Sequence, residues 1–352
     1  MRKLYLRLLL VGILMLLANS IAFSQACPAC SNPALQSNEK LEAGLDTLHK
    51  GAFRLTLNAI NGFDYLGGHL NWKGLATDGR LIDVPLHDHI VNLDFVRSEF
   101  SFEYTFKTNW AVWLRVPFDI KMQSASIDFV EPASEFEKEA IFKNRDIHHR
   151  TENYSGISDM RLIISHRFNG FLSKKGRLDF AFGTSLPVGK TEENPLEAKR
   201  LSIEHLHIQF GTGTFDPLLE LHYATGLSNK LSMAVFSINK ISLYENSKTY
   251  KGPFETTSGF SFGYKATNWL MPRLTFANFS QTWAKWDGEK DPNSGLISYN
   301  LTANFTFKLK NGLTITPGYR LPIAQKTLSD EGDAFEYGPT FTLNTSILFN
   351  NK

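Results

Sequence analysis

The sequence contains very little cysteine: Cys27 and Cys30 are the only two among 352 residues. Two cysteines are too few for a small secreted scaffold held together by disulfides. An excess of charge of one sign is also lacking, because 37 Lys and Arg residues balance 35 Asp and Glu residues to a formal net charge of +2. Nucleic-acid-binding proteins need a concentrated basic surface, so we expect no nucleic-acid partner.

Long hydrophobic runs are lacking beyond the N-terminus. There, the basic segment MRKLYLR is followed by an apolar run from Leu8 to Ala18 and then by small residues. This order is typical of a secretory signal peptide, and the apolar run is shorter than the roughly 20 residues that a transmembrane helix needs. We therefore assign residues 1–26 to a signal peptide and 27–50 to a periplasmic segment, and we expect no membrane-spanning helix after cleavage.

Aromatic residues, in contrast, are abundant, at 13% of the chain. In the segment FSFEYTFKTNWAVWLRVPFDIKM, residues 100–122, apolar and polar side chains alternate on both sides of a break at Thr108 and Asn109. Strict alternation is typical of half-buried strands, and the break indicates a β-hairpin. Each arm has about ten residues, the length of a tilted transmembrane strand.

The same pattern recurs along the chain and predicts twelve strands. Their ranges are 52–66, 91–107, 110–122, 156–168, 177–187, 215–225, 230–243, 255–266, 269–283, 296–308, 313–322 and 336–349. Long polar connections such as 67–90 alternate with short turns such as 267–268, as in outer-membrane barrels with short periplasmic turns and long extracellular loops. A soluble β-sandwich would explain one hairpin but not this asymmetry. We predict an all-β fold in which residues 51–352 form a transmembrane antiparallel β-barrel in the outer membrane of a Gram-negative cell, in contact with its lipid.

Several Tyr and Trp residues lie where predicted strands meet turns or loops. Such residues form interfacial girdles in membrane barrels. The candidates are Tyr65, Trp110, Trp269, Trp283, Trp286, Tyr299, Tyr319 and Tyr337.

Three segments in the middle of the chain carry a resemblance to a known family. They are YSGISDMRL at 154–162, FGTSLPVGKTEEN at 182–194 and FGTGTFDPLLELHYA at 210–224. These segments resemble the motifs of an outer-membrane β-barrel transporter family grouped under the meta-cleavage pathway of phenol degradation. The resemblance implies a porin-like protein that transports or binds a small solute, hydrophobic and aromatic molecules included.

Charged side chains on the inward parity of the strands are predicted to line the lumen. Both signs occur, whereas a strongly selective ion channel would show rings of one sign. A barrel of eight strands encloses only side chains, and one of sixteen strands leaves an open channel. Twelve strands lie between the two, so we keep two alternatives: a narrow or gated passage, and a closed barrel filled with charged side chains. The lumen candidates are Glu99, Glu103, Arg115, Asp119, Asp159, Arg161, Glu220, His222, Lys265, Arg273 and Arg320.

Histidines occur in pairs at the first three predicted extracellular connections. Imidazole binds zinc, copper, nickel and iron, and loops on one rim can converge. We therefore keep the handling of a metal (copper or zinc) or of haem as an alternative function. The other interpretation is that these histidines belong to ordinary polar loops. We expect no cofactor, apart from a divalent metal under the first interpretation. The candidate ligands are His87, His89, His148, His149, His205 and His207.

The two cysteines lie in ACPAC, at the predicted start of the mature chain. Ser31 stands where a haem-attachment motif has histidine, and two thiolates fill only half of a zinc site. A local disulfide, a redox or copper-handling pair, and lipidation of Cys27 after cleavage behind Ala26 are the alternatives. The residues do not determine an oligomeric state.

A lipid-hydrolysing outer-membrane enzyme is a further alternative, because His166 lies near Ser158 and Ser165 in the sequence. Such an enzyme needs a serine within hydrogen-bond reach of the histidine. The His-x-Ser-Asn-Gly segment of outer-membrane phospholipases is absent from the sequence. We therefore predict that the protein is not an enzyme.

Overall fold

The structure is a computed structural model, which describes residues 50–201, 209–309, 312–329 and 332–349. No helix in this part of the chain is long and apolar enough to cross a membrane. The predictions for the signal peptide and for the periplasmic segment 27–50 fall almost entirely outside the described residues, and they stay predictions. Four predicted site residues also lie outside: Cys27, Cys30, His205 and His207.

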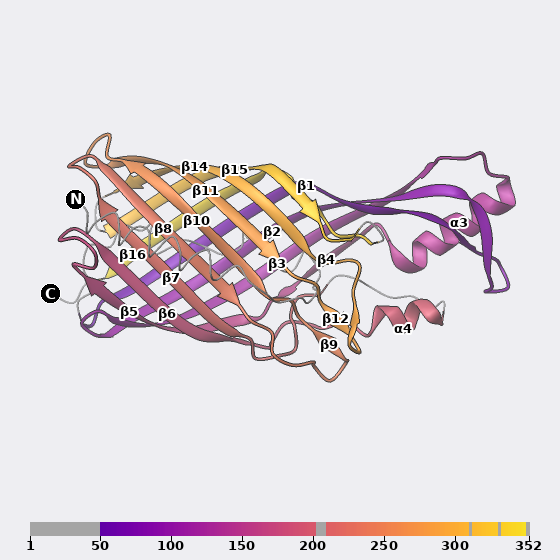
Figure 1. Ribbon diagram of the computed structural model, residues 1–352, viewed down its shortest axis with the longest axis horizontal. Helices are drawn as coiled ribbons and strands as arrows, with labels where there is room; N and C mark the ends of the chain where they lie inside the picture. Colours follow the sequence, from indigo (N-terminus) through magenta and orange to yellow (C-terminus); the bar gives the residue numbers. More distant parts are fainter. Residues whose placement is uncertain (1–49, 202–208, 310–311, 330–331, 350–352) are drawn as a thin grey trace.

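Twelve antiparallel strands form a closed barrel (Figure 1). Neighbours in the chain pair with each other, and β1 pairs with β16 from Phe53↔Phe349 to Gly62↔Thr340, which closes the ring. β4 and β5 share one position, because both pair with β3. The barrel strands are β1 (Phe53–Leu75), β2 (Leu81–Lys107), β3 (Trp110–Phe129), β4 (Glu152–Ile157) with β5 (Met160–Asn169), β6 (Arg177–Leu186), β7 (Pro217–Gly226), β8 (Leu231–Lys240), β10 (Glu255–Tyr264), β11 (Leu270–Gln281), β14 (Leu296–Lys308), β15 (Leu313–Thr327) and β16 (Thr340–Phe349).

The predicted barrel is confirmed, and each of the twelve predicted ranges overlaps a barrel strand. The prediction of a long loop at 67–90 is wrong. Here β1 and β2 continue as a paired hairpin up to Leu75↔Leu81. The turn between them contains Gly79 at φ 85°, a left-handed conformation that glycine adopts without steric cost.

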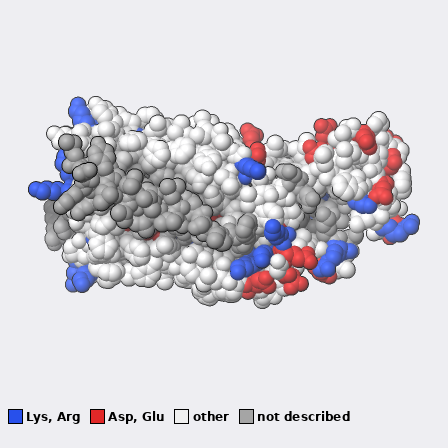
Figure 2. Space-filling model, in the orientation of Figure 1, with Lys and Arg blue, Asp and Glu red and all other residues white. Residues whose placement is uncertain are grey.

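The outward-facing side chains of the barrel wall are apolar. On β2, Phe100, Phe102 and Phe106 are exposed, whereas the intervening Ser101 and Glu103 are buried in the interior. Figure 2 shows Lys and Arg at the left end and mixed charges from the middle to the right end, whereas the described part of the surface between them is nearly free of charge on this face. An apolar outer wall around a polar interior is the arrangement of a transmembrane barrel. We call the part of the wall with apolar outward side chains the lipid band.

Beyond the lipid band, in the residues that precede Ser98, the outward face of β2 becomes more polar and its inward face becomes more apolar. The outward-facing side chains there include the polar Asn92 and Asp94 beside the half-buried Ile90 and Val96, and the inward-facing Leu93 and Phe95 are buried. In the residues that precede Ser98, β2 therefore resembles a strand of a water-soluble protein. Together with the matching parts of β1 and β3, it forms a projection beyond the long-loop end of the barrel, which we call the extension (Figure 1).

Helix α3 (Glu135–His148) packs against the extension. It begins with a capping box at Ser134, in which the side chain accepts a hydrogen bond from the first turn. Its buried residues Ala140 and Ile141 cluster with Val84 of β2. The helix ends at its C-cap His149, and this packing brings His149 next to the β1–β2 hairpin.

Short elements cover the long-loop end of the barrel. They are α4 (Pro195–Arg200) and a small sheet of β9 (Tyr250–Lys251), β12 (Lys285–Trp286) and β13 (Glu289–Lys290). The prediction of an interfacial girdle is wrong for three residues, because Tyr65, Trp286 and Tyr337 are at most 2% exposed. The rings of Trp286 and Tyr250 pack with centroids 4.6 Å apart, so these aromatic residues stabilise the covering layer instead of contacting lipid.

Candidate functional site

Ion pairs fill the interior of the barrel. Three of them have two hydrogen bonds each, a geometry that arginine and carboxylate form with little strain. These are Arg115–Glu220 (2.7 and 3.3 Å), Arg97–Asp119 (both 2.5 Å) and Arg167–Asp179 (2.6 and 3.0 Å). Arg115 lies on β3 and Glu220 lies on β7. The strands β5 and β6 lie between them in the barrel, so this pair crosses the lumen.

The predicted lumen residues fall into two groups. Most are buried or half-buried in the interior: Glu99, Glu103, Arg115, Asp119, Asp159, Arg161, Glu220, His222, Arg273 and Arg320. Lys265 does not line the lumen, because it follows β10 in a short turn and its side chain is exposed. β10 therefore ends at Tyr264, two residues before the end of the predicted range 255–266.

A segment from the connection before β7 folds into the long-loop end of the barrel. Asp159, at the break between β4 and β5, accepts hydrogen bonds from the backbone N–H of Thr212 at 2.7 Å and of Gly189 at 3.0 Å. Lys121 donates to the carbonyl oxygen of Gln209 at 2.5 Å and lies 4.6 Å from the ring centroid of Phe210. Residues 209–212, which we call the inner segment, are thus bound to the barrel wall through one carboxylate and one ammonium group.

Two glycines permit this close approach. A Cβ atom at Gly211 would lie 2.2 Å from Oδ1 of Asp159, and one at Gly189 would lie 2.5 Å from the carbonyl oxygen of Phe210. Any side chain at either position would therefore displace the inner segment. Asp159, Gly189 and Gly211 come from the three segments that carry the family resemblance, which the fold brings into contact.

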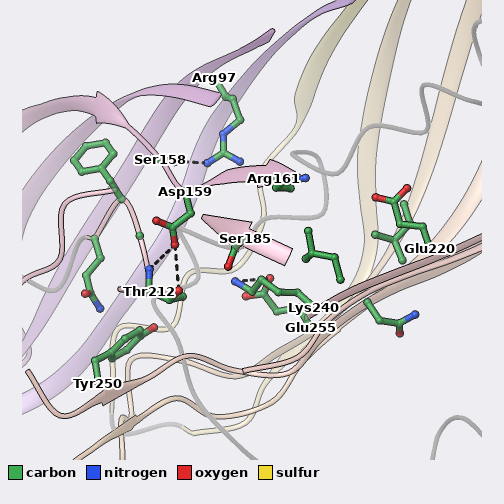
Figure 3. A pocket seen from close by; sticks show the side chains of 16 residues that line it. Arg97, Ser158, Asp159, Arg161, Ser185, Thr212, Glu220, Lys240, Tyr250 and Glu255 are labelled. Atoms are coloured by element: carbon green, nitrogen blue, oxygen red, sulfur yellow. Dashed lines mark hydrogen bonds and ion pairs between the residues drawn. The ribbon is translucent and has the colours of Figure 1, made fainter. Parts of the chain in front are cut away.

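A cavity of about 70 Å³ remains beside the inner segment (Figure 3). Its walls carry both charges, including Arg97, Arg161 and the Lys240–Glu255 ion pair. This volume accommodates a few water molecules, whereas a cavity that binds benzene is roughly 150 Å³. Between the described residues, this cavity is therefore too small for a solute of that size.

A second segment closes the barrel above the charged layer. Phe335 and Tyr337, from the connection between β15 and β16, pack with Tyr65, Leu93 and Phe279 into a buried apolar cluster. Tyr337 is bound through its backbone to the side chain of Gln325, with both hydrogen bonds at 2.8 Å. The charged layer and this apolar layer therefore lie in series along β1 and β2.

The predicted histidine ligands are distributed differently from the expected loops. His87 and His89 lie in strand β2 and are buried, and His149 is the buried C-cap of α3. His148 is half-buried, and the cluster of neighbouring ring nitrogens includes His89 and His149 but not His148. A residue that sequence reasoning missed, His69 of β1, completes the group, because its register partner on β2 is His89.

The serine–histidine arrangement of the lipase alternative is not formed by the candidate residues. His166 lies on the outer wall with its ring 4.4 Å from that of Trp110. Ser165 points inward and accepts a hydrogen bond from the indole N–H of Trp113 at 3.2 Å, and Ser158 donates to Asp119. Neither hydroxyl group is placed to be activated by His166.

Comparison with known proteins supports the fold. No family model matches the chain, and no curated protein matches its sequence. An outer membrane channel from Pseudomonas putida F1 aligns with a TM-score of 0.53 and 10% identity over 86% of this chain and 97% of the channel. At this identity the similarity concerns the fold of the barrel.

Two other solved barrels align over more of the chain but less closely. A Pseudomonas aeruginosa FadL homologue has a TM-score of 0.40 and 11% identity, over 93% of this chain and 98% of its own. The Pseudomonas putida toluene transporter TodX has a TM-score of 0.34 and 9% identity, over the same shares.

Proposed function

We propose that the protein is an outer-membrane channel for a small solute, with its short turns in the periplasm and the extension outside the cell. The observation that carries this proposal is the construction of the lumen. The wall is a complete barrel, and the structure is closed by two segments from loops, 209–212 and 332–337, packed inside it. Segments from loops can move without breaking the strand pairing, so the barrel can open while its wall stays intact.

The inner segment is the more readily displaced of the two. Its contacts with the wall are chiefly those to Asp159 and Lys121, and the cavity beside it already separates it from part of the wall. Loss of the Asp159 carboxylate removes the acceptor of two backbone N–H groups at once. Asp159 is therefore proposed as the residue that keeps the passage closed.

The solute class is proposed from the two ends of the passage. At the long-loop end a solute meets the apolar cluster with Tyr65 and Phe335. At the short-turn end it meets a groove of about 380 Å³ in which the charged lining residues are all basic among the described residues. They are Lys174, Lys175, Arg177, Arg273 and Lys308. A small molecule with an apolar or aromatic part and a negative charge fits both ends, and the family resemblance also implies small aromatic solutes.

Planar-bilayer recording of the refolded protein tests the channel. We expect small or infrequent conductance steps for the wild type, and steps several-fold larger or more frequent for Asp159→Ala, because the inner segment loses its main acceptor. The matched control is Asp128→Ala, which removes an exposed carboxylate of β3 outside the lipid band. Heat-modifiable migration on a gel shows that each protein is folded. Absence of conductance in both the folded wild type and folded Asp159→Ala would show a closed barrel and contradict the channel proposal.

The solute class has its own measurement. In a salt gradient, the reversal potential of the Asp159→Ala channel should indicate preference for anions, and Lys174→Glu with Lys175→Glu should weaken it. Relative to protein-free vesicles, which neutral benzyl alcohol enters through the lipid, the channel should accelerate the uptake of benzoate by a larger factor than the uptake of benzyl alcohol. Equal acceleration of both solutes would contradict the proposed negative charge without affecting the channel proposal.

A further inference from the structure

Three imidazole rings from three different segments meet in the extension. His69 of β1, His89 of β2 and His149 at the end of α3 each offer a ring nitrogen, and these nitrogens lie within 4.8 Å of one another. The ring centroids are 5.2 to 5.7 Å apart. We propose that these three histidines bind one divalent transition-metal ion, a function beyond that of the channel.

The hydrogen bonds of His89 prepare one of its nitrogens for a metal. Nδ1 of His87 lies 2.9 Å from the carbonyl oxygen of Pro85, which can only accept, so this nitrogen carries the proton. Nε2 of neutral His87 is then an acceptor, and Nε2 of His89, 3.1 Å away, must donate to it. The lone pair of His89 is therefore on Nδ1, a buried atom without a hydrogen-bond partner among the described residues.

Asp333 orients the other two rings. Its Oδ1 lies 2.7 Å from Nδ1 of His69, and its Oδ2 lies 3.2 Å from Nε2 of His149. A carboxylate accepts, so both imidazoles donate through these nitrogens and, when neutral, carry their lone pairs on the opposite ones. Hydrogen bonds from metal-binding histidines to a carboxylate fix the ring orientation and raise the basicity of the ligand. Each of the three rings thus has a hydrogen-bond partner that fixes its orientation.

The protonation state of His89 also suits a ligand. Burial, together with the neighbouring His149, His69 and His87, lowers the pKa of His89 to about 2, although Asp333 opposes the shift. His89 lies outside the lipid band, and it is among the residues that line a surface groove of about 410 Å³.

Three imidazoles with an open fourth position suit zinc, copper(II), nickel or cobalt(II). Metal–nitrogen bonds of about 2.0–2.1 Å place tetrahedral ligand atoms roughly 3.3 Å apart, so the rings have to move inward from their present separation of up to 4.8 Å. Gly68 beside His69 permits the close packing of the hairpin here, because a Cβ atom would lie 2.1 Å from the carbonyl oxygen of His89.

Metal titration of the purified mature protein, without a polyhistidine tag, tests the site. We expect one cobalt(II) ion per chain, with the visible absorption of a tetrahedral complex, and displacement by zinc. His89→Ala or His149→Ala should weaken binding at least about 100-fold, since each removes one of three ligands. Asp333→Asn and His87→Gln should weaken it by roughly 10- to 100-fold, as loss of orienting partners does.

His148→Ala is the matched control, because it removes the histidine next to His149 in the chain that is not in the group. It should leave the affinity unchanged, and so should Cys27→Ser with Cys30→Ser, and His205→Ala with His207→Ala. Binding lost only with the cysteines or with His205 and His207 would overturn the proposal, as would absence of binding to the folded wild type.

A measurement on the wild type alone guards against variants that do not fold. Zinc should slow hydrogen exchange at 65–70, 87–90 and 332–337, because the bound ion would join β1, β2, α3 and the segment with Asp333. Exchange in these ranges that is unchanged by saturating zinc would overturn the proposal. Exchange at the short turn 108–109 should not change in either case.

Discussion

Strands β1, β2 and β3 run through both the lipid band and the extension, and they meet opposite surroundings in the two regions. Within the band, β2 turns Phe102 toward lipid and buries Glu103, whereas in the extension it turns Asn92 toward water and buries Leu93. The alternation is unbroken, so the strand keeps its geometry and changes only its solvent. What differs is how the interior is filled: by paired charges inside the band, and by apolar side chains such as Leu93 and Phe95 inside the extension.

The difference teaches how a buried carboxylate is accommodated in each region. In the lumen, Glu220 and Asp119 have arginine partners within hydrogen-bond distance. Among the loops at the long-loop end, Asp291 is buried and receives only neutral donors, the backbone N–H of Asn293 and the indole N–H of Trp286. The first arrangement stabilises the charged form, and the second does not.

The largest effect is expected from breaking a lumen pair. Glu220→Gln leaves Arg115 buried without its carboxylate, and removal of one partner of a buried pair costs about 3–5 kcal/mol. Arg115→Leu combined with Glu220→Leu should recover most of this loss, because neither charge of the pair is then left buried without its partner. Urea unfolding in lipid vesicles measures both, and a double variant as unstable as the single one would contradict the argument.

Reversing the chemistry of an outward position sharpens the comparison along β2. Phe102→Arg places a charge against lipid and should destabilise the barrel by about 2–4 kcal/mol if Phe102 lies near the bilayer midplane. Asn92→Arg on the same face of the same strand should change the free energy of unfolding by less than about 0.5 kcal/mol, because it is a surface site in water. Equal losses in vesicles would show that the lipid band extends to residue 92.

The smallest effect concerns Asp291 and depends on pH. Burial raises the pKa of Asp291 to about 6 from 3.8, so the unfolded loop ionises at lower pH than the folded one. Its stabilising contribution is full below pH 3.8 and is lost as pH rises through 6, by roughly 2 kcal/mol between pH 4 and 6. Hydrogen exchange of residues 284–295, corrected for intrinsic rates, should therefore report easier opening at pH 7 than at pH 4.5.

Asp291→Asn provides the control for this pH dependence. The amide cannot ionise, so the correction for intrinsic exchange should leave no difference between the two pH values in this loop. A pH dependence that persists in the variant would assign it to another group and would remove Asp291 from the comparison.

The sequence predicted the barrel because alternation with a period of two is a local property of each strand. It did not predict the extension, since 67–90 carries polar residues on one face and resembles a loop when lipid is the assumed surroundings. The same assumption misplaced Tyr65 and Tyr337, which lie at the ends of the predicted strands 52–66 and 336–349 but belong to the buried apolar cluster beyond the lipid band. Distinguishing the two requires knowing where the membrane ends, which alternation alone does not encode.

The sites were predictable to different degrees. Asp159, Gly189 and Gly211 lie in segments singled out by the family resemblance, but only tertiary structure shows that they touch. His69 could have been found by extending the β1–β2 hairpin, because the register pairs it with His89. Asp333 could not, since it reaches His69 from a connection 264 residues later in the chain.

β1 can meet its partner β16 only after the last part of the chain has been synthesised. The ten residue pairs between them join positions about 300 residues apart, whereas β1 and β2 are joined by a short turn. Until then, the free edge of β1 presents unpaired N–H and C=O groups to any other strand, which is a route to aggregation. Closing this single seam is therefore the expected last step in biogenesis, and a factor that assists assembly has to shield or guide this edge.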